Sequence, residues 1–204
     1  MPPPASVSRT PVAVLGTLAE FHREPIPYDL GSLVRLVARL HPDLLCLDLT
    51  REQWERRDFG NLPPEYQEAL LPLAHQTDIV VAPIAGDRPP PEPTAPGWRG
   101  RAIATLRQWL GGLHRRAPGP EAVNSGWRHA TADLLYEAIG RLAGHAHRRL
   151  QTAHTLHLVQ AVRDVARRDP GCRILVVLNV RYCHHIRRAL KAYPDVQVVD
   201  YTEL

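Results

Sequence analysis

Cysteine, lysine and aromatic residues are scarce in this chain of 204 residues, and their scarcity excludes several classes of protein. Three cysteines, Cys46, Cys172 and Cys183, are too few and too scattered for a disulfide framework, and they form no CxxC pair for zinc or redox chemistry. We interpret them as small buried hydrophobic residues. Aromatic residues make up 6% of the chain, so it offers few platforms on which nucleic-acid bases could stack.

Long hydrophobic segments are also missing. No run of about 18 apolar residues occurs, and the opening MPPPASVSRTP has neither the hydrophobic region nor the cleavage site of a signal peptide. We therefore expect a soluble, cytoplasmic protein with no membrane partner.

The net charge of +4 comes from arginines, since Lys191 is the only lysine, and acids are interspersed among them. This distribution disfavours nucleic acid as a partner.

Strand-like and helix-like segments alternate in the first part of the chain. The apolar run VAVLGTL precedes a helical pattern over residues 29–40, and a Pro-Asp step leads into the apolar run LLCLDL. A second helical pattern over residues 63–78 precedes the β-branched run IVVAPIAG. This order predicts an α/β fold of three layers, with a mainly parallel sheet flanked by helices and a functional site at the carboxyl ends of the strands.

The rest of the chain is expected to complete a single domain, residues 1–204. Five prolines in residues 88–97 exclude a helix or a central strand, so this segment is interpreted as an exposed connector. Residues 98–168 carry helical patterns and are interpreted as a helical insertion or cap in the middle of the chain. The final segment returns to a strand, ILVVL, then a loop, a helix and a last short strand.

Polar residues follow three of the predicted strands, and parallel strands would bring them to one edge of the sheet. Thr17 and His22 follow the first strand, Asp48 ends the second, and the segment NVRYCHH follows ILVVL. His22 and Asp48 could position or activate water, directly or through a metal ion. The alternative is that His22 fills a turn and Asp48 caps the next helix.

The segment NVRYCHH, residues 179–185, is the richest in candidate groups. Arg181 would hold an anionic group of a ligand, and Tyr182 would donate a hydrogen bond to developing negative charge. His184 is a candidate metal ligand together with His22 and Asp48. The alternative is that Tyr182 and one histidine pack under the next helix, while Arg181 and the other histidine face water.

Histidines also recur in the helical stretch that precedes this strand. Their spacing puts His147, Gln151, His154 and either His157 or Leu158 on one side of a helix. His154 and His157 could share an ion there. Neighbouring arginines oppose a cation there, and an amphipathic helix with histidines at its polar boundary is the alternative. No G-x-S-x-G elbow, phosphate loop or H-E-x-x-H motif is present.

Taken in order, these motifs resemble those of the TraB/PrgY, Tiki and ChaN-like superfamily, which includes erythromycin-esterase-like proteins. LGTLAEFH is similar to the GT-x-H opening of the family, and HPDLLCLDL to its step into a strand that ends in an acid. RDPGCRILVVLNVRYCHHIRRAL resembles the closing strand, loop and helix. The resemblance covers most of the chain except the connector and part of the helical middle. It implies metal-dependent hydrolysis, or binding of a small ligand or haem, at the strand ends.

The resemblance assigns the first histidine of the family to His22 and its glutamate to Asp48, with Thr17 in the GT pair. His22 stands further from the GT pair than in a compact GT-x-H motif. Aspartate in place of glutamate shortens the reach of a ligand. A metal site copied from the family would therefore be incomplete in this half of the chain.

The closing motif departs further from the family pattern. Asn179 stands where glycine is usual, and Tyr182 stands where the histidine should be, which removes a neutral nitrogen donor. His184 is displaced from that position by two residues. The arginine and asparagine of the preceding helix correspond to about His154 and Thr155. Thr17, Asn179 and His154 are therefore candidate ligand-binding residues.

We expect a polar pocket at the strand ends that binds a small molecule or hydrolyses it, and a divalent metal is the cofactor that the resemblance suggests. Whether the chain is an enzyme stays open at this point, as does assembly into a homo-oligomer. The alternative function is an inactive structural or protein-interaction module that uses the proline-rich connector and the arginine-rich helices.

Overall fold

A computed structural model describes residues 9–86 and 90–204, apart from the side chain of Glu20. The opening MPPPASVS and the first two residues of the predicted connector lie outside the described residues. In the described part of the chain, five strands form one parallel sheet in the order β3–β2–β4–β1–β5. The strands are β1 (Thr10–Thr17), β2 (Leu44–Leu47), β3 (Val80–Pro83), β4 (Ile174–Asn179) and β5 (Val196–Val199).

The sheet is built around β4, whose five leading residues are all apolar and fully buried. Strands that are covered on both faces have such continuous apolar sequences. β4 pairs with β1 on one side, so that Thr17 lies opposite Asn179, and with β2 on the other side, so that Leu47 lies opposite Val177. The carboxyl ends of these three strands therefore meet at one edge.

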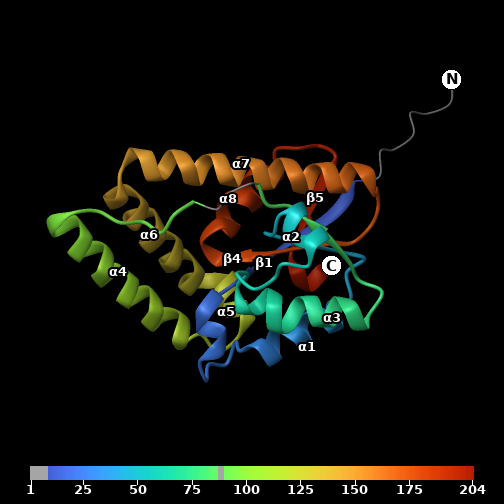
Figure 1. Ribbon diagram of the computed structural model, residues 1–204, viewed down its shortest axis with the longest axis horizontal. Coiled ribbons are helices and arrows are strands. Elements are labelled where there is room, and N and C mark those ends of the chain that lie inside the picture. The colour runs from blue at the N-terminus through green and yellow to red at the C-terminus, as the bar shows by residue number, and fades with distance from the viewer. Residues whose placement is uncertain (1–8, 87–89) are drawn as a thin grey trace.

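Helices cover both faces of the sheet, and Figure 1 shows the resulting three layers. One layer contains α1 (Leu30–Leu40), the π-helical segment η2 (Glu65–Leu70), α3 (Leu71–Gln76) and α5 (Pro120–Asn124). The other layer contains α7 (His145–Arg168) and α8 (Val180–Leu190). Ala13 and Leu15 of β1 pack into the first layer, whereas Val12 and Val14 pack into the second, because successive strand residues point to opposite faces. The prediction of a three-layer α/β fold is confirmed.

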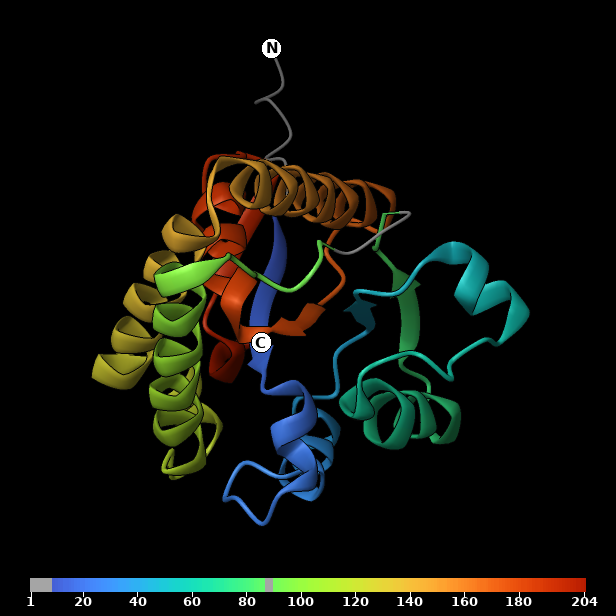
Figure 2. The same cartoon turned by 60° about the vertical axis from the view of Figure 1, so that its left-hand side comes forward.

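Two helices of the predicted insertion stand beside the sheet. α4 (Gly97–Arg115) and α6 (Gly126–Ala143) pack against each other, and Figure 2 shows them side by side, away from α2 (Arg51–Arg56). The carboxyl-terminal part of α7 behaves differently, since its apolar residues from Leu158 onward are buried against the sheet. The insertion therefore supplies both a side wall and part of a covering layer.

Local signals in the sequence explain where two of these helices begin. The side chain of Asp29 accepts a hydrogen bond from the backbone N–H of Ser32, which caps α1. Thr50 and Gln53 form a capping box at the start of α2.

Two short 3-10 turns, η1 (Ala19–Arg23) and η3 (Tyr201–Glu203), complete the described elements. Across the described ranges, every helix is too short or too polar to cross a membrane.

Candidate functional site

The edge where β1, β2 and β4 end carries three of the candidate residues. Thr17 and Asn179 are paired neighbours in the sheet, and Asp48 directly follows β2. Tyr66 of η2 ties two of these strand ends together. Its hydroxyl accepts from the backbone N–H of Asp48, with 3.3 Å between nitrogen and oxygen, and donates to the carbonyl of Val177 at 2.8 Å.

Asp48 and His154 of α7 form a hydrogen bond at this edge. The distance between Asp48 Oδ2 and His154 Nε2 is 3.2 Å, and the two side chains are 18% and 4% exposed. The alternative role for Asp48 as a helix cap does not apply, because Thr50 caps α2. His157, the histidine that could have shared an ion with His154, lies beside Gly86. The structure therefore joins Asp48 to His154, two residues that the sequence placed in separate motifs.

Tyr182 adds a third group to this pair. Its ring centre lies 5.1 Å from that of His154, and the Arg181 guanidinium carbon lies 4.7 Å from the centre of the Tyr182 ring. Burial raises the pKa of Tyr182 to about 12, with Asp48 acting in the same direction and Arg181 in the opposite one. The phenol is therefore protonated near neutral pH and can donate a hydrogen bond, as expected of this residue.

A cavity of about 350 Å³ opens beside these residues. Its walls come from the turn after β1 and from α4, α6, α7 and α8, and they include Phe21, His114, Tyr136, His147, Gln151, Asn179, Arg181 and Tyr182. Asn179 also has a structural task, because its side chain accepts from the backbone N–H of Arg181 and caps α8. The helical insertion thus forms the wall of a cavity at the carboxyl ends of the strands, where ligands bind in folds of this class.

Glu92 lies over this cavity and bridges two arginines in it. Its Oε1 is 3.0 Å from Arg181 Nη1, and its Oε2 is 2.7 Å from Arg107 Nη2. Arg107 Nη2 also donates to the carbonyl of Pro93, so the connector is attached to the cavity wall. The sequence does not single out Glu92, because the prolines around it predict only an exposed connector.

His22 is occupied by the backbone on both sides of its ring. Nε2 accepts a hydrogen bond from the backbone N–H of Leu18 at 2.9 Å, and Nδ1 donates to the carbonyl of Tyr28 at 2.7 Å. Burial lowers the pKa of His22 to about 4, so the ring is neutral. Neither nitrogen is free in this arrangement to bind a metal or to take a proton from water. The contacts match the alternative in which His22 closes a turn, and they do not support a metal shared by His22 and Asp48.

Glu65 is a buried carboxylate at this edge that sequence reasoning missed. The Thr17 hydroxyl lies 2.7 Å from Glu65 Oε1 and 3.0 Å from the carbonyl oxygen of Leu178. Glu65 begins the π-helical segment η2, a conformation that recurs at functional sites. A signal was present, since Glu65 stands four residues before Ala69 on the apolar face of the predicted helix, where a charge is unusual.

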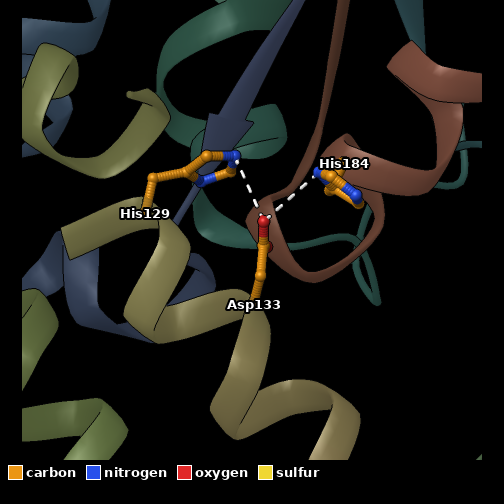
Figure 3. A group of neighbouring side chains, drawn as sticks. All are labelled: His129, Asp133 and His184. Carbon is orange, nitrogen blue, oxygen red and sulfur yellow. Dashed lines mark ion pairs between the residues drawn. The ribbon is translucent and has the colours of Figure 1, made fainter. Parts of the chain in front are cut away.

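His184 contacts Asp133, whereas His154 contacts Asp48. His184 belongs to α8, and Figure 3 shows its ring beside the carboxylate of Asp133 of α6. The distance between His184 Nδ1 and Asp133 Oδ2 is 3.5 Å. The expected metal site of His22, Asp48 and His184 is therefore not assembled, because each of the two histidines has a different set of partners. The structure does bring together Asp48, His154 and Tyr182, with Arg181 and Asn179 next to them on the cavity wall.

Comparisons of the chain with protein families, with curated proteins and with solved structures find no match.

Proposed function

We propose that the cavity beside Tyr182 binds a small molecule that carries a phosphate or carboxylate group. The observation that supports this proposal is the position of Glu92, whose carboxylate lies between Arg107 and Arg181. A carboxylate held by two guanidinium groups marks a place where an anionic group of a ligand would bind. In the proposed complex, the ligand replaces Glu92 and keeps both arginines paired.

Arg181 is more shielded from water than Glu92, and this difference favours such an exchange. The side chain of Glu92 is 67% exposed and belongs to the connector, whereas the Arg181 side chain is mostly covered and packs on the Tyr182 ring. Exposed ion pairs are weak, so breaking the contacts of Glu92 costs little free energy. The covered arginine stays in place and presents its planar group to the incoming anion.

Hydrolysis of the bound molecule is a second candidate function, and the Asp48–His154 pair is the observation that favours it. A carboxylate that orients a histidine is a recurring device for taking a proton from water or from a nucleophile. Tyr182 contacts His154 and lines the cavity, so its hydroxyl is suited to stabilise negative charge that develops on a substrate.

The donor groups at this edge do not fit the metal centre that the superfamily resemblance implies. Asp48 and His154 offer two donors, and among the described residues no third histidine, cysteine or acidic side chain lies close enough to share an ion with them. A catalytic zinc ion takes three protein ligands. Tyr182 is a poor third ligand, because burial raises the pKa of its phenol to about 12. Membership of the TraB and ChaN-like superfamily therefore remains a proposal, and we propose that any hydrolysis at this edge proceeds without a bound metal.

The interaction-module alternative finds less support in these contacts. Pro93 of the connector is buried, and its carbonyl accepts a hydrogen bond from Arg107 Nη2. A proline-rich segment that docks into an aromatic groove on another protein must be free to do so.

Ligand titration of the purified full chain tests the proposed binding. Inorganic phosphate, a phosphomonoester and a dicarboxylate are titrated by isothermal calorimetry into the wild type and into the variants Arg181→Met and Arg107→Met. We expect at least one of these anions to bind the wild type and each variant to weaken that binding. The exposed arginines Arg101 of α4 and Arg188 of α8 provide matched controls, whose methionine variants should bind as the wild type does.

The proposal fails if none of the anions binds, or if the Arg181→Met and Arg107→Met variants bind as tightly as the two controls. Hydrolysis is tested separately with chromogenic phosphate and carboxylate esters. Turnover that disappears in Asp48→Asn while anion binding persists would support the second candidate, and absence of turnover with intact anion binding would leave a binding protein.

A further inference from the structure

Three side chains that no part of the proposed function uses converge between α6 and α8. His129 and Asp133 lie one turn apart on α6, and His184 faces them from α8 (Figure 3). Asp133 Oδ2 is 3.5 Å from His129 Nε2 and 3.5 Å from His184 Nδ1. One donor atom from each residue lies within 4.8 Å of the other two. We infer that His129, Asp133 and His184 form a binding site for a divalent transition-metal ion.

The spacing of these atoms is close to that of a coordination sphere. Ligand bonds of about 2.1 Å place neighbouring donors about 3.0 to 3.4 Å apart in octahedral and tetrahedral geometry. Two of the three separations are 3.5 Å, so small rotations of the side chains are enough to bring the donors onto one ion. The histidine and aspartate on α6 are held one turn apart by the helix, which provides a preformed pair of ligands.

The exposure of the three side chains suits an ion that enters from solvent. His129, Asp133 and His184 are 12%, 23% and 54% exposed. His184 is the most exposed of the three, so its ring has the most room to rotate toward an ion. The open side of the ion would be completed by water, as in metal sites that have three protein ligands.

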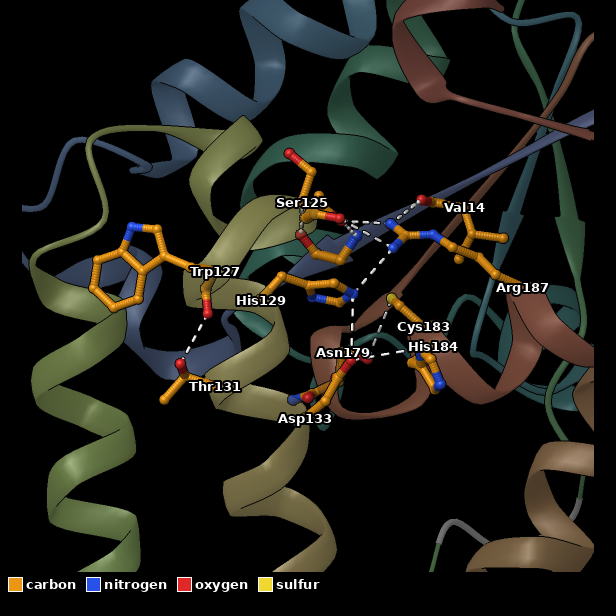
Figure 4. A network of polar contacts seen from close by, with 12 residues as sticks. Val14, Ser125, Trp127, His129, Thr131, Asp133, Asn179, Cys183, His184 and Arg187 are labelled. Atoms are coloured by element: carbon orange, nitrogen blue, oxygen red, sulfur yellow. Dashed lines mark hydrogen bonds and ion pairs between the residues drawn. The ribbon is translucent and has the colours of Figure 1, made fainter.

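The positively charged Arg187 lies next to His129 and would repel a bound cation. Its Nη1 lies 3.3 Å from His129 Nε2 and donates to it, which shows that this nitrogen carries the lone pair that a metal requires. Figure 4 shows Arg187 near His129 and Val14. Arg187 also donates to the carbonyl of Val14 at 2.8 Å, to the carbonyl of Asn124 at 3.1 Å and to Asn124 Oδ1 at 3.0 Å. It therefore keeps three hydrogen bonds when an ion takes its place on His129.

The donor set selects the class of ion. Two imidazoles and one carboxylate suit Zn²⁺, Ni²⁺, Co²⁺ and Cu²⁺, whereas Mg²⁺ and Ca²⁺ prefer sites built from oxygen. The positive charge of Arg187 further disfavours Mg²⁺ and Ca²⁺, whose binding depends mainly on electrostatic attraction to oxygen ligands.

Metal titration of the untagged full chain tests this inference. The protein is treated with a chelator, and Co²⁺, Zn²⁺ and Mg²⁺ are added separately. Calorimetry gives the stoichiometry, and the visible absorption of Co²⁺ reports nitrogen coordination. We expect one Zn²⁺ or Co²⁺ per chain and no binding of Mg²⁺. His184→Ala and Asp133→Asn should each weaken Zn²⁺ binding by about tenfold or more.

His185→Ala is the matched control, because His185 is exposed on the same helix and adjoins the site without belonging to it. This control matters in a chain with 11 histidines. His184 is itself exposed, so loss of binding in His184→Ala cannot be attributed to unfolding, and circular dichroism of each variant checks this. The inference is overturned if no stoichiometric metal binds, or if His184→Ala and His185→Ala bind Zn²⁺ equally well.

Discussion

His154 Nε2 lies 3.2 Å from Asp48 Oδ2, although 106 positions separate the two residues in the sequence. Asp48 stands at the end of a central strand, and His154 belongs to the helix that covers the sheet. Both side chains are mostly shielded from water, so their attraction is weakly screened and connects the sheet edge to this helical layer. The Tyr182 ring packs on His154 and extends the group to the cavity.

A double-mutant cycle measures the strength of this contact. We expect Asp48→Asn, His154→Gln and the double variant to give a coupling free energy of about 1 to 3 kcal/mol in urea unfolding, as charge-assisted hydrogen bonds that are largely buried do. The exposed pair of His41 and Asp78, with 3.0 Å between Nε2 and Oδ1, is the matched control and should show almost no coupling. Equal coupling in the two cycles would contradict the conclusion that the shielded contact between Asp48 and His154 is stronger than an exposed one.

The fold and the edge that carries the site were predictable from the sequence, because both depend on local patterns. Continuous apolar runs identified the central strands, and the alternation with helices implied that the strands are parallel. Parallel strands in register place Thr17, Asp48 and Asn179 at one edge, whatever their distance in the chain. The helical spacing also placed His147, Gln151 and His154 on one side of α7.

The partners of these residues were not predictable, because they depend on how helices pack and where loops turn. Periodicity cannot tell which histidine of α7 meets the sheet, and His154 rather than His157 reaches Asp48. The position of His22 after the first strand makes it a candidate for chemistry, but its two ring nitrogens are hydrogen-bonded to the backbone of Leu18 and Tyr28. Glu92 stands among prolines that carry no signal of the arginines it meets.

Gly16 is expected to tolerate no side chain. The side-chain oxygen of Asn124 accepts from the Gly16 N–H at 2.6 Å, and a Cβ at Gly16 would lie 3.0 Å from that oxygen and 3.0 Å from Val180 Cβ. Gly16→Ala should therefore lower the free energy of unfolding by about 1 to 3 kcal/mol, since crowding a packed interior displaces its neighbours. Urea denaturation followed by circular dichroism measures the change.

Gly112 provides the control for this substitution. It lies within α4, and a Cβ there would meet no atom within 4 Å. Gly112→Ala should raise the free energy of unfolding by about 0.5 to 1 kcal/mol, because alanine loses less conformational entropy in a helix. If Gly16→Ala proved as stable as the wild type, the tight approach of α5 to β1 described here would be incorrect.

Stability should fall as the solution is acidified below neutral pH. Burial lowers the pKa of both His22 and His114 from 6.5 to about 4, so between these values the unfolded chain binds protons that the folded chain does not. The unfolded state is then favoured as the pH falls, and the stability present above pH 6.5 is lost progressively toward pH 4. The loss amounts to as much as about 3 kcal/mol per histidine.

Urea unfolding at pH 7, 6, 5 and 4.5 measures this loss, and His114→Phe should reduce the slope. The His114 ring packs near Phe21 and Tyr136, so phenylalanine retains much of its packing while removing the titrating group. Phe21→Leu alters the same packing without removing a titrating group, and its stability should decrease equally at each pH. A slope in His114→Phe identical to that of the wild type would show that burial of this ring does not govern the pH dependence.

Glu92→Gln should increase the affinity of the cavity for inorganic phosphate. The substitution preserves the shape of the side chain but removes the negative charge that lies between Arg107 and Arg181, so phosphate no longer competes with a resident anion. We expect calorimetry to show that phosphate binds roughly threefold to tenfold more tightly. The gain is modest because the ion pairs that an exposed carboxylate forms are weak. Glu55→Gln, which removes an exposed negative charge from α2, controls for the change in net charge. Weaker binding by Glu92→Gln would mean that Glu92 positions the two arginines for the ligand, and the proposed exchange of one anion for another would then be incorrect.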